Sequence, residues 1–211
     1  MNEKVFYAIV TAIVIVGGVG VGVAYYHAPV ASAGSQVQGP YHLNLVEVMD
    51  ANYGNGMGAQ PRYYEVVNGS LQSTANITLP SDTEIVVTIT AYDMGNASVG
   101  KQFLKPVGVV GDQVQVINGS VAMGDNVSQQ WATNLSAFPA SLVLHTFTIL
   151  QGSTTVVNIP VMPGFTEITS FYLNSTGSYA WQCEAACGTG STGWGGPMSA
   201  AGWMMGTVFV Q

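Results

Sequence analysis

The chain has 211 residues, of which only 7% are charged, and 4 Lys and Arg residues against 11 Asp and Glu residues give a net charge of -7 at pH 7. So few bases exclude a basic patch of the kind that binds nucleic acid. The chain also lacks a glycine-rich phosphate loop and a nucleophile paired with a base, which argues against an independent hydrolase or transferase.

The first segment is an uncharged run from Val5 to Tyr26. At 1.5 Å per helical residue, about 22 residues cross a hydrocarbon core of roughly 30 Å. We therefore predict a single transmembrane anchor over residues 1–27, with Lys4 on the cytoplasmic side and the main domain on the extracytoplasmic side of the cell membrane. A cleaved signal peptide with its site at Ala31-Ser-Ala33 is the alternative.

Residues 28–40 are rich in Ala, Ser, Gly and Pro, which predicts a flexible stalk. Residues 41–211 have the length of one domain. Within it, segments rich in Val, Ile, Thr and aromatic residues alternate with turn signals, which predicts an all-β, Greek-key β-sandwich without a long helix. The predicted strands are Leu43–Val48, Tyr63–Val67, Ser70–Leu79, Glu84–Ala91, Gln113–Ile117, Val143–Leu150, Thr154–Ile159, Glu167–Leu173, Gly177–Gln182 and Thr207–Val210.

Two connections within the domain have distinct signals. Asn68-Gly69 predicts a hairpin turn, because both residues tolerate a positive φ. The stretch from Tyr92 to Pro139 is less regular, and we predict that it forms a long excursion on the sandwich.

Asn-x-Ser/Thr triplets without proline recur along the predicted ectodomain and indicate a glycosylated external surface. The alternative is chance occurrence in a chain rich in Asn, Ser and Thr. The candidate sites are Asn68, Asn76, Asn96, Asn118, Asn126, Asn134 and Asn174.

The shortage of charge bears on the medium outside the cell. A surface with so few charged groups needs either glycans or an acidic medium to stay soluble. Protonating a few carboxylates costs little when few ion pairs depend on them. We therefore hypothesise the outer surface of an acidophile, with a glycan-solubilised surface at neutral pH as the alternative.

The chemistry-bearing residues lie in the last third of the chain. His145 lies on the predicted strand Val143–Leu150. Cys183 and Cys187, with three residues between them, follow the predicted strand that ends at Gln182, and Met204 comes shortly before the last predicted strand. Thiolate, imidazole and thioether are the ligands that electron-transferring copper favours. This pattern indicates a copper site in the loop between two terminal strands.

The same residues carry a resemblance. Val143-Leu-His145-Thr-Phe-Thr-Ile149, Ile159-Pro-Val-Met-Pro-Gly164 and Gly177-Ser-Tyr-Ala-Trp-Gln-Cys183-Glu-Ala-Ala-Cys187-Gly188 resemble the cupredoxin domain of subunit II of haem-copper terminal oxidases. The motifs occur in that family's order, and they cover roughly Ser141 to Gln211. An anchoring helix before an external domain is also similar to the short form of that subunit.

The resemblance implies a role for each candidate ligand. His145 would supply an imidazole, Cys183 and Cys187 the bridging thiolates, Ala185 a backbone carbonyl and Met204 the thioether of a binuclear copper centre. The motif is incomplete, however. The family has histidine and methionine four and seven residues after the second cysteine, where this chain has Ser191 and Trp194, and a glycine-rich insertion, residues 190–201, occupies that loop.

Other uses of these residues stay open. Cys183 and Cys187 could form a disulfide, because external cysteines usually do. His145 could be a hydrogen-bonded structural residue, and His42, whose spacing suggests no ligand role, is expected at the surface. Met198 and Met205 are expected to serve packing.

The resemblance implies a subunit II-like component of a membrane oxidase in aerobic respiration, either non-catalytic or an electron-entry subunit. A degenerate copper centre would suit a version fed directly by quinol. Its partners would be the membrane, a haem-bearing subunit I, and a quinol, cytochrome or small copper protein as electron donor. The alternatives are a free-standing membrane-anchored carrier of one copper ion and a non-redox glycosylated surface module.

Overall fold

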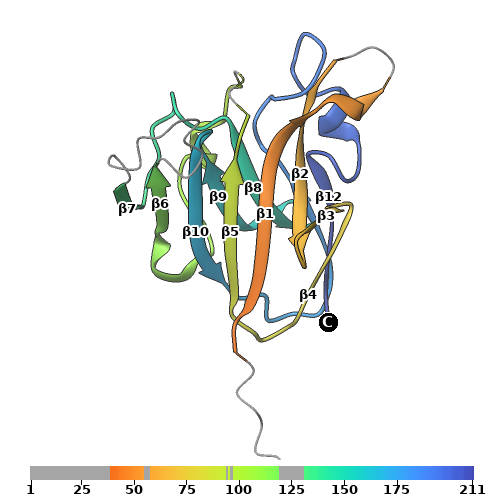
Figure 1. Cartoon of the computed structure of the whole chain (residues 1–211). Helices are drawn as coiled ribbons and strands as arrows, with labels where there is room; N and C mark the ends of the chain where they lie inside the picture. Colours follow the sequence, from red (N-terminus) through yellow and green to blue (C-terminus); the bar gives the residue numbers. More distant parts are fainter. Residues whose placement is uncertain (1–38, 55–57, 94, 96, 119–130) are drawn as a thin grey trace, which may run out of the picture. The chain divides into compact units, whose positions relative to one another are not determined.

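The computed structural model of the chain describes residues 39–54, 58–93, 95, 97–118 and 131–211. They form an all-β sandwich of two sheets, which confirms the predicted all-β class and two-sheet architecture (Figure 1). Within these ranges, no helix has the length and apolar character needed to cross a membrane. The predicted anchor and most of the predicted stalk lie outside the described residues.

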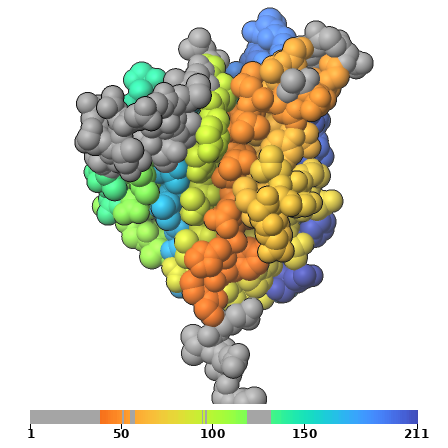
Figure 2. Space-filling view, viewed as in Figure 1, coloured from red at the N-terminus to blue at the C-terminus, as the bar shows by residue number. Residues whose placement is uncertain are grey.

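The larger sheet has seven strands, and Figure 2 shows its outer face, where β1 (Tyr41–Asp50), β2 (Gln60–Val67), β3 (Ser70–Ser73) and β5 (Ile85–Ala91) lie side by side. β1 and β5 pair in parallel, whereas the other neighbouring strands pair antiparallel. In order across the sheet, the strands are β3 (Ser70–Ser73), β2 (Gln60–Val67), β1 (Tyr41–Asp50), β5 (Ile85–Ala91), β10 (Phe165–Phe171), β6 (Val114–Asn118) and β7 (Trp131–Leu135).

The second sheet has five strands, in the order β4 (Asn76–Leu79), β12 (Met205–Val210), β11 (Gly177–Gln182), β8 (His145–Gln151) and β9 (Thr154–Val161). β12 and β4 pair in parallel. Short 3-10 helices lie in the connections: η1 (Ala51–Tyr53), η2 (Lys101–Phe103), η3 (Val110–Asp112) and η5 (Gly196–Ser199).

The core lies between the two sheets and follows from strand alternation. Every second residue of β1 and β5 points inward, and these residues pack against inward residues of β4, β8 and β12. Burial of this apolar area, at about 25 cal/mol per Å², is the main force that holds the sheets together. Fully buried members include Leu43, Leu45, Ile85, Ile89, Ile77, Leu79, Phe147, Ile149 and Val208.

The structure divides the predicted strand Ser70–Leu79 in two. Thr74 is fully buried between the halves, where its hydroxyl donates to the Tyr63 carbonyl and its own carbonyl accepts from Trp181 Nε1 at 2.7 Å. These bonds hold Thr74 at the point where the chain crosses between the sheets, so β3 belongs to the larger sheet and β4 to the smaller one. The hairpin at Asn68-Gly69 is confirmed, with φ angles of 51° and 74°.

The predicted excursion from Tyr92 to Pro139 is partly regular. It supplies β6, close to the predicted strand Gln113–Ile117, and the unpredicted β7, both of which extend the larger sheet. Before β6, the segment around Ser98 and Val99 packs on the cysteine loop. The excursion is therefore a structural part of the domain.

The sequon asparagines differ in exposure. Asn118 is half-buried, and Asn96 and Asn126 lie outside the described residues. Glycosylation stays a prediction. The exposed ones are Asn68, Asn76, Asn134 and Asn174.

Buried carboxyl groups make the stability of this fold depend on pH. Burial raises the pKa of Glu167 well above its ordinary value, although Oε1 accepts a hydrogen bond from the Met162 N–H at 2.8 Å. Such a group is neutral in both the folded and unfolded states below about pH 4.5, and there it costs nothing. Above that pH the unfolded state ionises first, so the folded state loses stability as the pH rises.

We predict that Glu167→Gln leaves the free energy of unfolding unchanged near pH 4 and raises it relative to wild type at pH 7. The free energy of unfolding of wild type should not collapse between pH 7 and pH 2. Asp50 acts in the opposite direction: burial would raise its pKa, but hydrogen bonds from Tyr64, Asn52 and Arg62 lower it. The stabilisation from Asp50 is therefore lost on the acid side. Urea unfolding of the detergent-solubilised chain, followed by tryptophan fluorescence, measures both. Wild-type stability that falls steeply in acid would contradict the acidophile hypothesis.

Candidate metal centre

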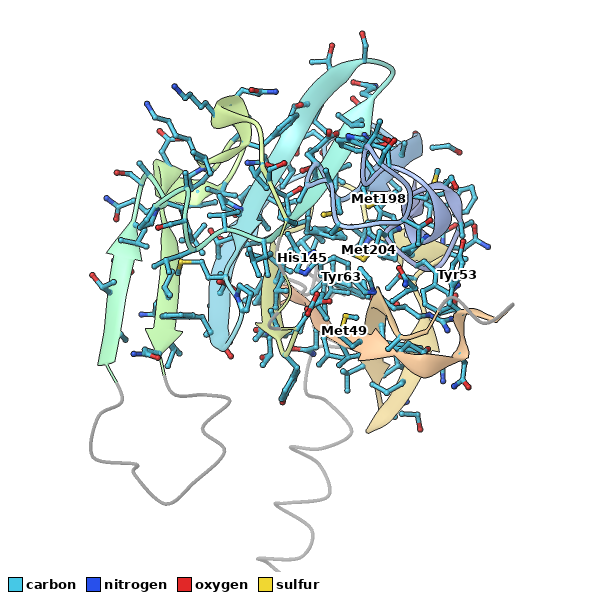
Figure 3. All side chains as sticks on the ribbon, turned by 90° about the horizontal axis from the view of Figure 1, so that it is seen from above. Met49, Tyr53, Tyr63, His145, Met198 and Met204 are labelled. Atoms are coloured by element: carbon cyan, nitrogen blue, oxygen red, sulfur yellow. The ribbon has the colours of Figure 1, made fainter. Side chains whose placement is uncertain are left out.

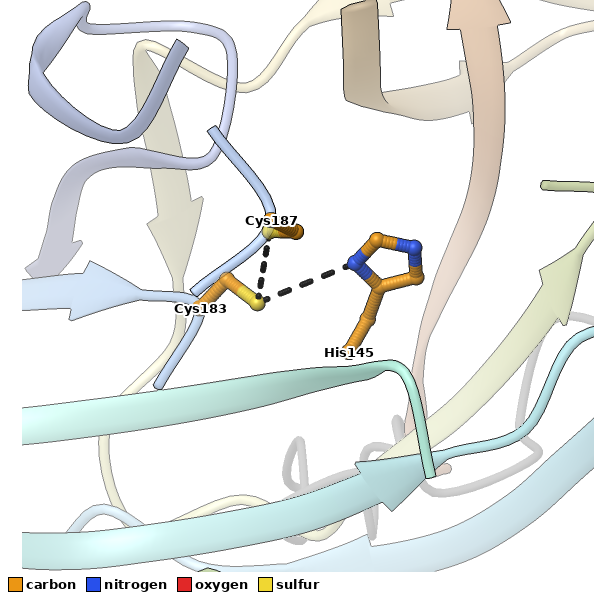
Figure 4. A group of neighbouring side chains, drawn as sticks. All are labelled: His145, Cys183 and Cys187. Carbon is orange, nitrogen blue, oxygen red and sulfur yellow. Dashed lines mark hydrogen bonds between the residues drawn. The ribbon is translucent and has the colours of Figure 1, made fainter. Parts of the chain in front are cut away.

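The candidate ligands meet at one end of the sandwich. His145 is the first residue of β8, Cys183 directly follows β11, and Cys187 lies in the loop after it. β8 and β11 are hydrogen-bonded neighbours, so their ends bring the imidazole and the thiols together, as Figure 4 shows. His145 and Cys183 are fully buried, and Cys187 is partly buried.

The donor atoms form a continuous arc. His145 Nδ1 lies 3.9 Å from Cys183 Sγ, which lies 3.5 Å from Cys187 Sγ. Cys187 Sγ in turn lies 3.2 Å from the sulfur of Met198. One ligand atom from each of His145, Cys183 and Cys187 lies within 4.8 Å of the others, close enough for one metal ion to bind all three. Both cysteines are free thiols in this arrangement.

The Met198 thioether lies beside the second thiol, although Met198 was expected to serve packing and the resemblance implied Met204. Met204 is fully buried, and its carbonyl accepts the Cys183 N–H at 2.8 Å, which fixes the backbone at the first cysteine. Figure 3 shows both methionines at this end of the domain. The carbonyl of Ala185, the other implied ligand, accepts the Cys187 N–H at 2.8 Å in a tight turn.

The glycine-rich insertion folds back on the cysteine loop. Thr189 and Gly195 exchange two backbone hydrogen bonds of 3.0 and 2.9 Å, and the Gly188 N–H donates to the Gly193 carbonyl at 2.7 Å. A Cβ on Gly188 would lie 2.2 Å from the Gly195 carbonyl oxygen and 2.6 Å from Met198 Cγ. Glycine at this position therefore permits the close approach of Met198.

Arg62 of β2 ties the end of the insertion to the larger sheet. Its Nε donates to the Gly202 carbonyl at 2.9 Å, and its guanidinium lies over the Trp203 ring at 4.7 Å. An ion pair of 3.0 Å with Asp50 orients the guanidinium. The insertion is thus a packed lobe of the domain.

A buried polar network that starts at Thr146 fixes the position of Cys183. The Thr146 N–H donates to Cys183 Sγ at 3.4 Å, and the Thr146 hydroxyl accepts the Glu184 N–H at 2.8 Å. The same hydroxyl bonds Thr148, which donates to Asn158 Oδ1 at 2.8 Å. Buried, satisfied networks of this kind rigidify a core. The thiol is held by its neighbours before any ligand arrives.

Two buried carboxyl groups stand behind His145, on the side of the ring that faces away from the sulfurs. His145 Nε2 lies 3.0 Å from Asp93 Oδ2 and 3.6 Å from Glu47 Oε1. Sequence reasoning missed both residues. The available signal was weak: Glu47 continues the inward series Leu43, Leu45 on β1, in a chain that has few acids.

These carboxylates change the acidity of the imidazole. Burial would lower the pKa of His145, but the charge of Glu47 and the hydrogen bond to Asp93 raise it to about 10. Burial raises the pKa of Glu47 to about 7, against the opposing effect of His145. Without a metal, the imidazole is therefore protonated at neutral pH.

The two thiols differ in acidity. Burial would raise the pKa of Cys183, but hydrogen bonds from Cys187 and His145, with the charge of His145, lower it well below its ordinary value. The hydrogen bond to Cys183, and then burial, raise the pKa of Cys187. These shifts favour the thiolate at Cys183 and the thiol at Cys187. A metal ion that binds there must displace protons, because it needs a deprotonated imidazole and thiolates.

A cavity of about 170 Å³ lies next to these groups. It is lined by His145, Cys187 and Asp93, together with Met49 and Pro61 of the larger sheet. Met49 is 46% exposed, which places the cavity near the surface of the domain. The cavity provides an approach to the imidazole and the second thiol.

No protein-family model matches the chain, and no curated relative matches it. Solved structures with a similar course of the chain include rusticyanin from Thiobacillus ferrooxidans, with 14% identity and a TM-score of 0.38 over 81% of this chain and 76% of that one. Auracyanin B is 12% identical, with a TM-score of 0.35 over 81% of this chain and 88% of that one. A multicopper oxidase from Campylobacter jejuni is 9% identical, with a TM-score of 0.36 over 82% of this chain and 30% of that one. Another multicopper oxidase is covered over 44% of its length. Likenesses this distant carry no functional inference.

The donor set itself fits a soft metal ion. Two sulfurs bound to one ion at about 2.3 Å with tetrahedral angles lie about 3.8 Å apart, and the two cysteine sulfurs here lie 3.5 Å apart. Soft sulfur ligands suit Cu(I), zinc and iron–sulfur clusters, and a thioether is not among the usual ligands of zinc. The site is therefore suited to copper.

We predict that Met198→Leu lowers the affinity for Cu(I) by roughly tenfold, which corresponds to about 1.4 kcal/mol. Leucine has a similar volume, so the fold should be retained while the thioether is lost. Competition against a chromophoric Cu(I) chelator measures the change. Met204→Leu is the matched control and should bind as wild type does; a larger loss there than at Met198 would restore Met204 as the ligand.

Proposed function

We propose that this chain is a membrane-anchored, cupredoxin-type electron-transfer domain that holds copper at the end of its β-sandwich. The convergence of His145, Cys183 and Cys187 carries the proposal, with the Met198 sulfur 3.2 Å from Cys187 Sγ beside them. When bound, copper would supply one-electron exchange between its two oxidation states. The residues of this chain would hold it in a frame that moves little between those states.

The ligand count favours one copper ion over two. The binuclear site of the oxidase family needs a second imidazole, and among the described residues the other histidine is His42. His42 is exposed on β1, five residues before Glu47, which is a separation of roughly 16 Å along a strand. It is the surface histidine that was expected, and it supplies no ligand here.

The subunit II role is the finer part of the proposal. The order of the His145, Cys183 and Cys187 motifs and the predicted anchor support a subunit II-like component of a haem-copper terminal oxidase. In that role the chain would pass electrons to a haem-bearing subunit I from a cytochrome, a small copper protein or a quinol. The retained donors favour a version that still holds copper over one that has lost it.

A free-standing, membrane-anchored carrier of one copper ion is the second candidate, and the single imidazole favours it. Both candidates place the domain outside the cell membrane, with acid exposure and glycosylation as further proposals. A non-redox surface module is the third candidate, and it would need no arc of converging sulfur atoms.

We predict that the reduced full-length chain takes up stoichiometric copper and, once oxidised, shows visible copper-thiolate absorption. Cys183→Ser should abolish the absorption, because it removes the buried thiolate, whereas His42→Ala should leave it unchanged. Metal analysis and absorption spectroscopy measure both. A chain purified without copper, with Cys183 and Cys187 joined in a disulfide, would support the surface module.

A second prediction separates the two redox candidates. If the chain is an oxidase subunit, mild detergent extraction from its native membrane should yield it with a haem-bearing integral membrane protein. The haem spectrum of the purified complex measures this, and its copper content can be compared with that of the isolated chain. Repeated recovery of the copper-loaded chain without haem would favour the free-standing carrier.

A further inference from the structure

The buried carboxyl groups of Glu47 and Asp93 have no role in the copper site as described so far. Glu47 is fully buried and Asp93 nearly so, and both face the same nitrogen of His145. Burial of two carboxylates opposite one imidazole is costly, because the loss of hydration of ionised groups exceeds several kcal/mol for each. An apolar pair would fill this part of the core without that cost.

Their contacts form a chain of hydrogen bonds that begins on β1 and ends at the imidazole. Glu47 Oε2 accepts the Asp93 N–H at 3.2 Å, which holds the backbone just after β5. Asp93 Oδ1 accepts the Gly95 N–H at 2.6 Å, and Asp93 Oδ2 lies 3.0 Å from His145 Nε2. Both oxygens of Asp93 are therefore oriented, and one is directed at the ring.

The geometry assigns the two ring nitrogens different tasks. A proton on Nε2 is satisfied by Asp93, so the lone pair of the neutral ring falls on Nδ1, the nitrogen that faces Cys183. Glu47 Oε1 has no hydrogen-bond partner among the described residues and lies 3.6 Å from the same Nε2. It adds negative charge on that side of the ring.

We propose that Asp93 is a positioning residue for the copper ligand His145, and that Glu47 acts through Asp93 by holding its backbone. The pair fixes the tautomer and the orientation of the ring, and its charge favours the more oxidised metal. The proposal rests on the proposed copper function. It concerns residues from the first half of the chain, outside the cysteine, histidine and methionine motifs.

The direct alternative is that Glu47, Asp93 and His145 Nε2 themselves bind a metal ion, since their ligand atoms also lie within 4.8 Å of one another. The two arrangements differ at one atom. In the positioning role Nε2 keeps its proton when copper is bound, whereas in the alternative Nε2 is a ligand.

The test uses the full-length chain in detergent with Cu(I) alone as the probe. Cu(I) affinity is measured by chelator competition, the reduction potential by titration, and the protonated nitrogen of His145 by 15N NMR of the diamagnetic Cu(I) form. The variants are Asp93→Ala, Asp93→Asn and Glu47→Gln. Glu167→Gln is the matched control, because Glu167 is an equally buried carboxyl group of the same core that contacts Met162.

We expect Asp93→Ala to weaken Cu(I) binding by about 10- to 100-fold, the usual effect of losing a partner of a metal-ligating histidine. Asp93→Asn should recover part of the affinity, since its amide oxygen still accepts a hydrogen bond, and should raise the reduction potential because a charge is lost. Glu47→Gln should shift both quantities less, and Glu167→Gln should shift neither. In wild type, the proton should reside on Nε2.

Other results would overturn the assignment. Unchanged affinity in Asp93→Ala, an equal loss in Glu167→Gln, or copper on Nε2 would each remove the positioning role while leaving copper binding intact. Failure of wild type to take up copper would instead refute the proposed function. In that event the metal-free chain still tests the contact, because the Nε2 proton should exchange with water more slowly in wild type than in Asp93→Ala.

Discussion

The candidate metal centre depends on His145, whose two ring nitrogens contact different groups. Nδ1 faces Cys183, which belongs to the five-stranded sheet, and Nε2 faces Asp93 and Glu47, which belong to the seven-stranded sheet and its connection. The imidazole therefore joins the two layers of the sandwich by polar contacts, where the rest of the core joins them by apolar packing. Any movement of one sheet against the other would change the distance between the ring and the carboxyl groups of Glu47 and Asp93.

Charge is scarce in this chain, and part of it lies where water cannot screen it. Of the 11 acidic residues, Glu47 and Glu167 are fully buried and Asp93 is nearly so. In a low-dielectric interior, a charge affects its neighbours far more strongly than it does at the surface. This explains how the pKa of His145 can rise to about 10 despite burial, while that of Cys183 falls well below its ordinary value.

Strand periodicity predicted the all-β class and most strands, because inward and outward residues alternate strictly on half-buried strands such as β1 and β5. It could not predict that Ser70–Leu79 divides, since the exchange between sheets depends on the distant partners of Thr74, Tyr63 and Trp181. The residue pattern was enough to predict His145, Cys183 and Cys187 as candidate ligands, and the structure brings them together. Asp93 was not, because its role arises only when the end of β5 meets the start of β8.

The glycine-rich insertion shows why a ligand loop cannot be judged by counting residues. Counting forward from Cys187 reaches Ser191 and Trp194, which are unsuited to copper, and the loop looks degenerate. In space, the backbone bonds between Thr189 and Gly195 close the added residues into a lobe, and η5 returns Met198 to 3.2 Å from the Cys187 thiol. Because Gly188 leaves room for this approach, the lobe places a thioether beside the thiols. The described donor atoms are therefore one imidazole nitrogen and three sulfurs, and soft metal ions prefer donors of this kind.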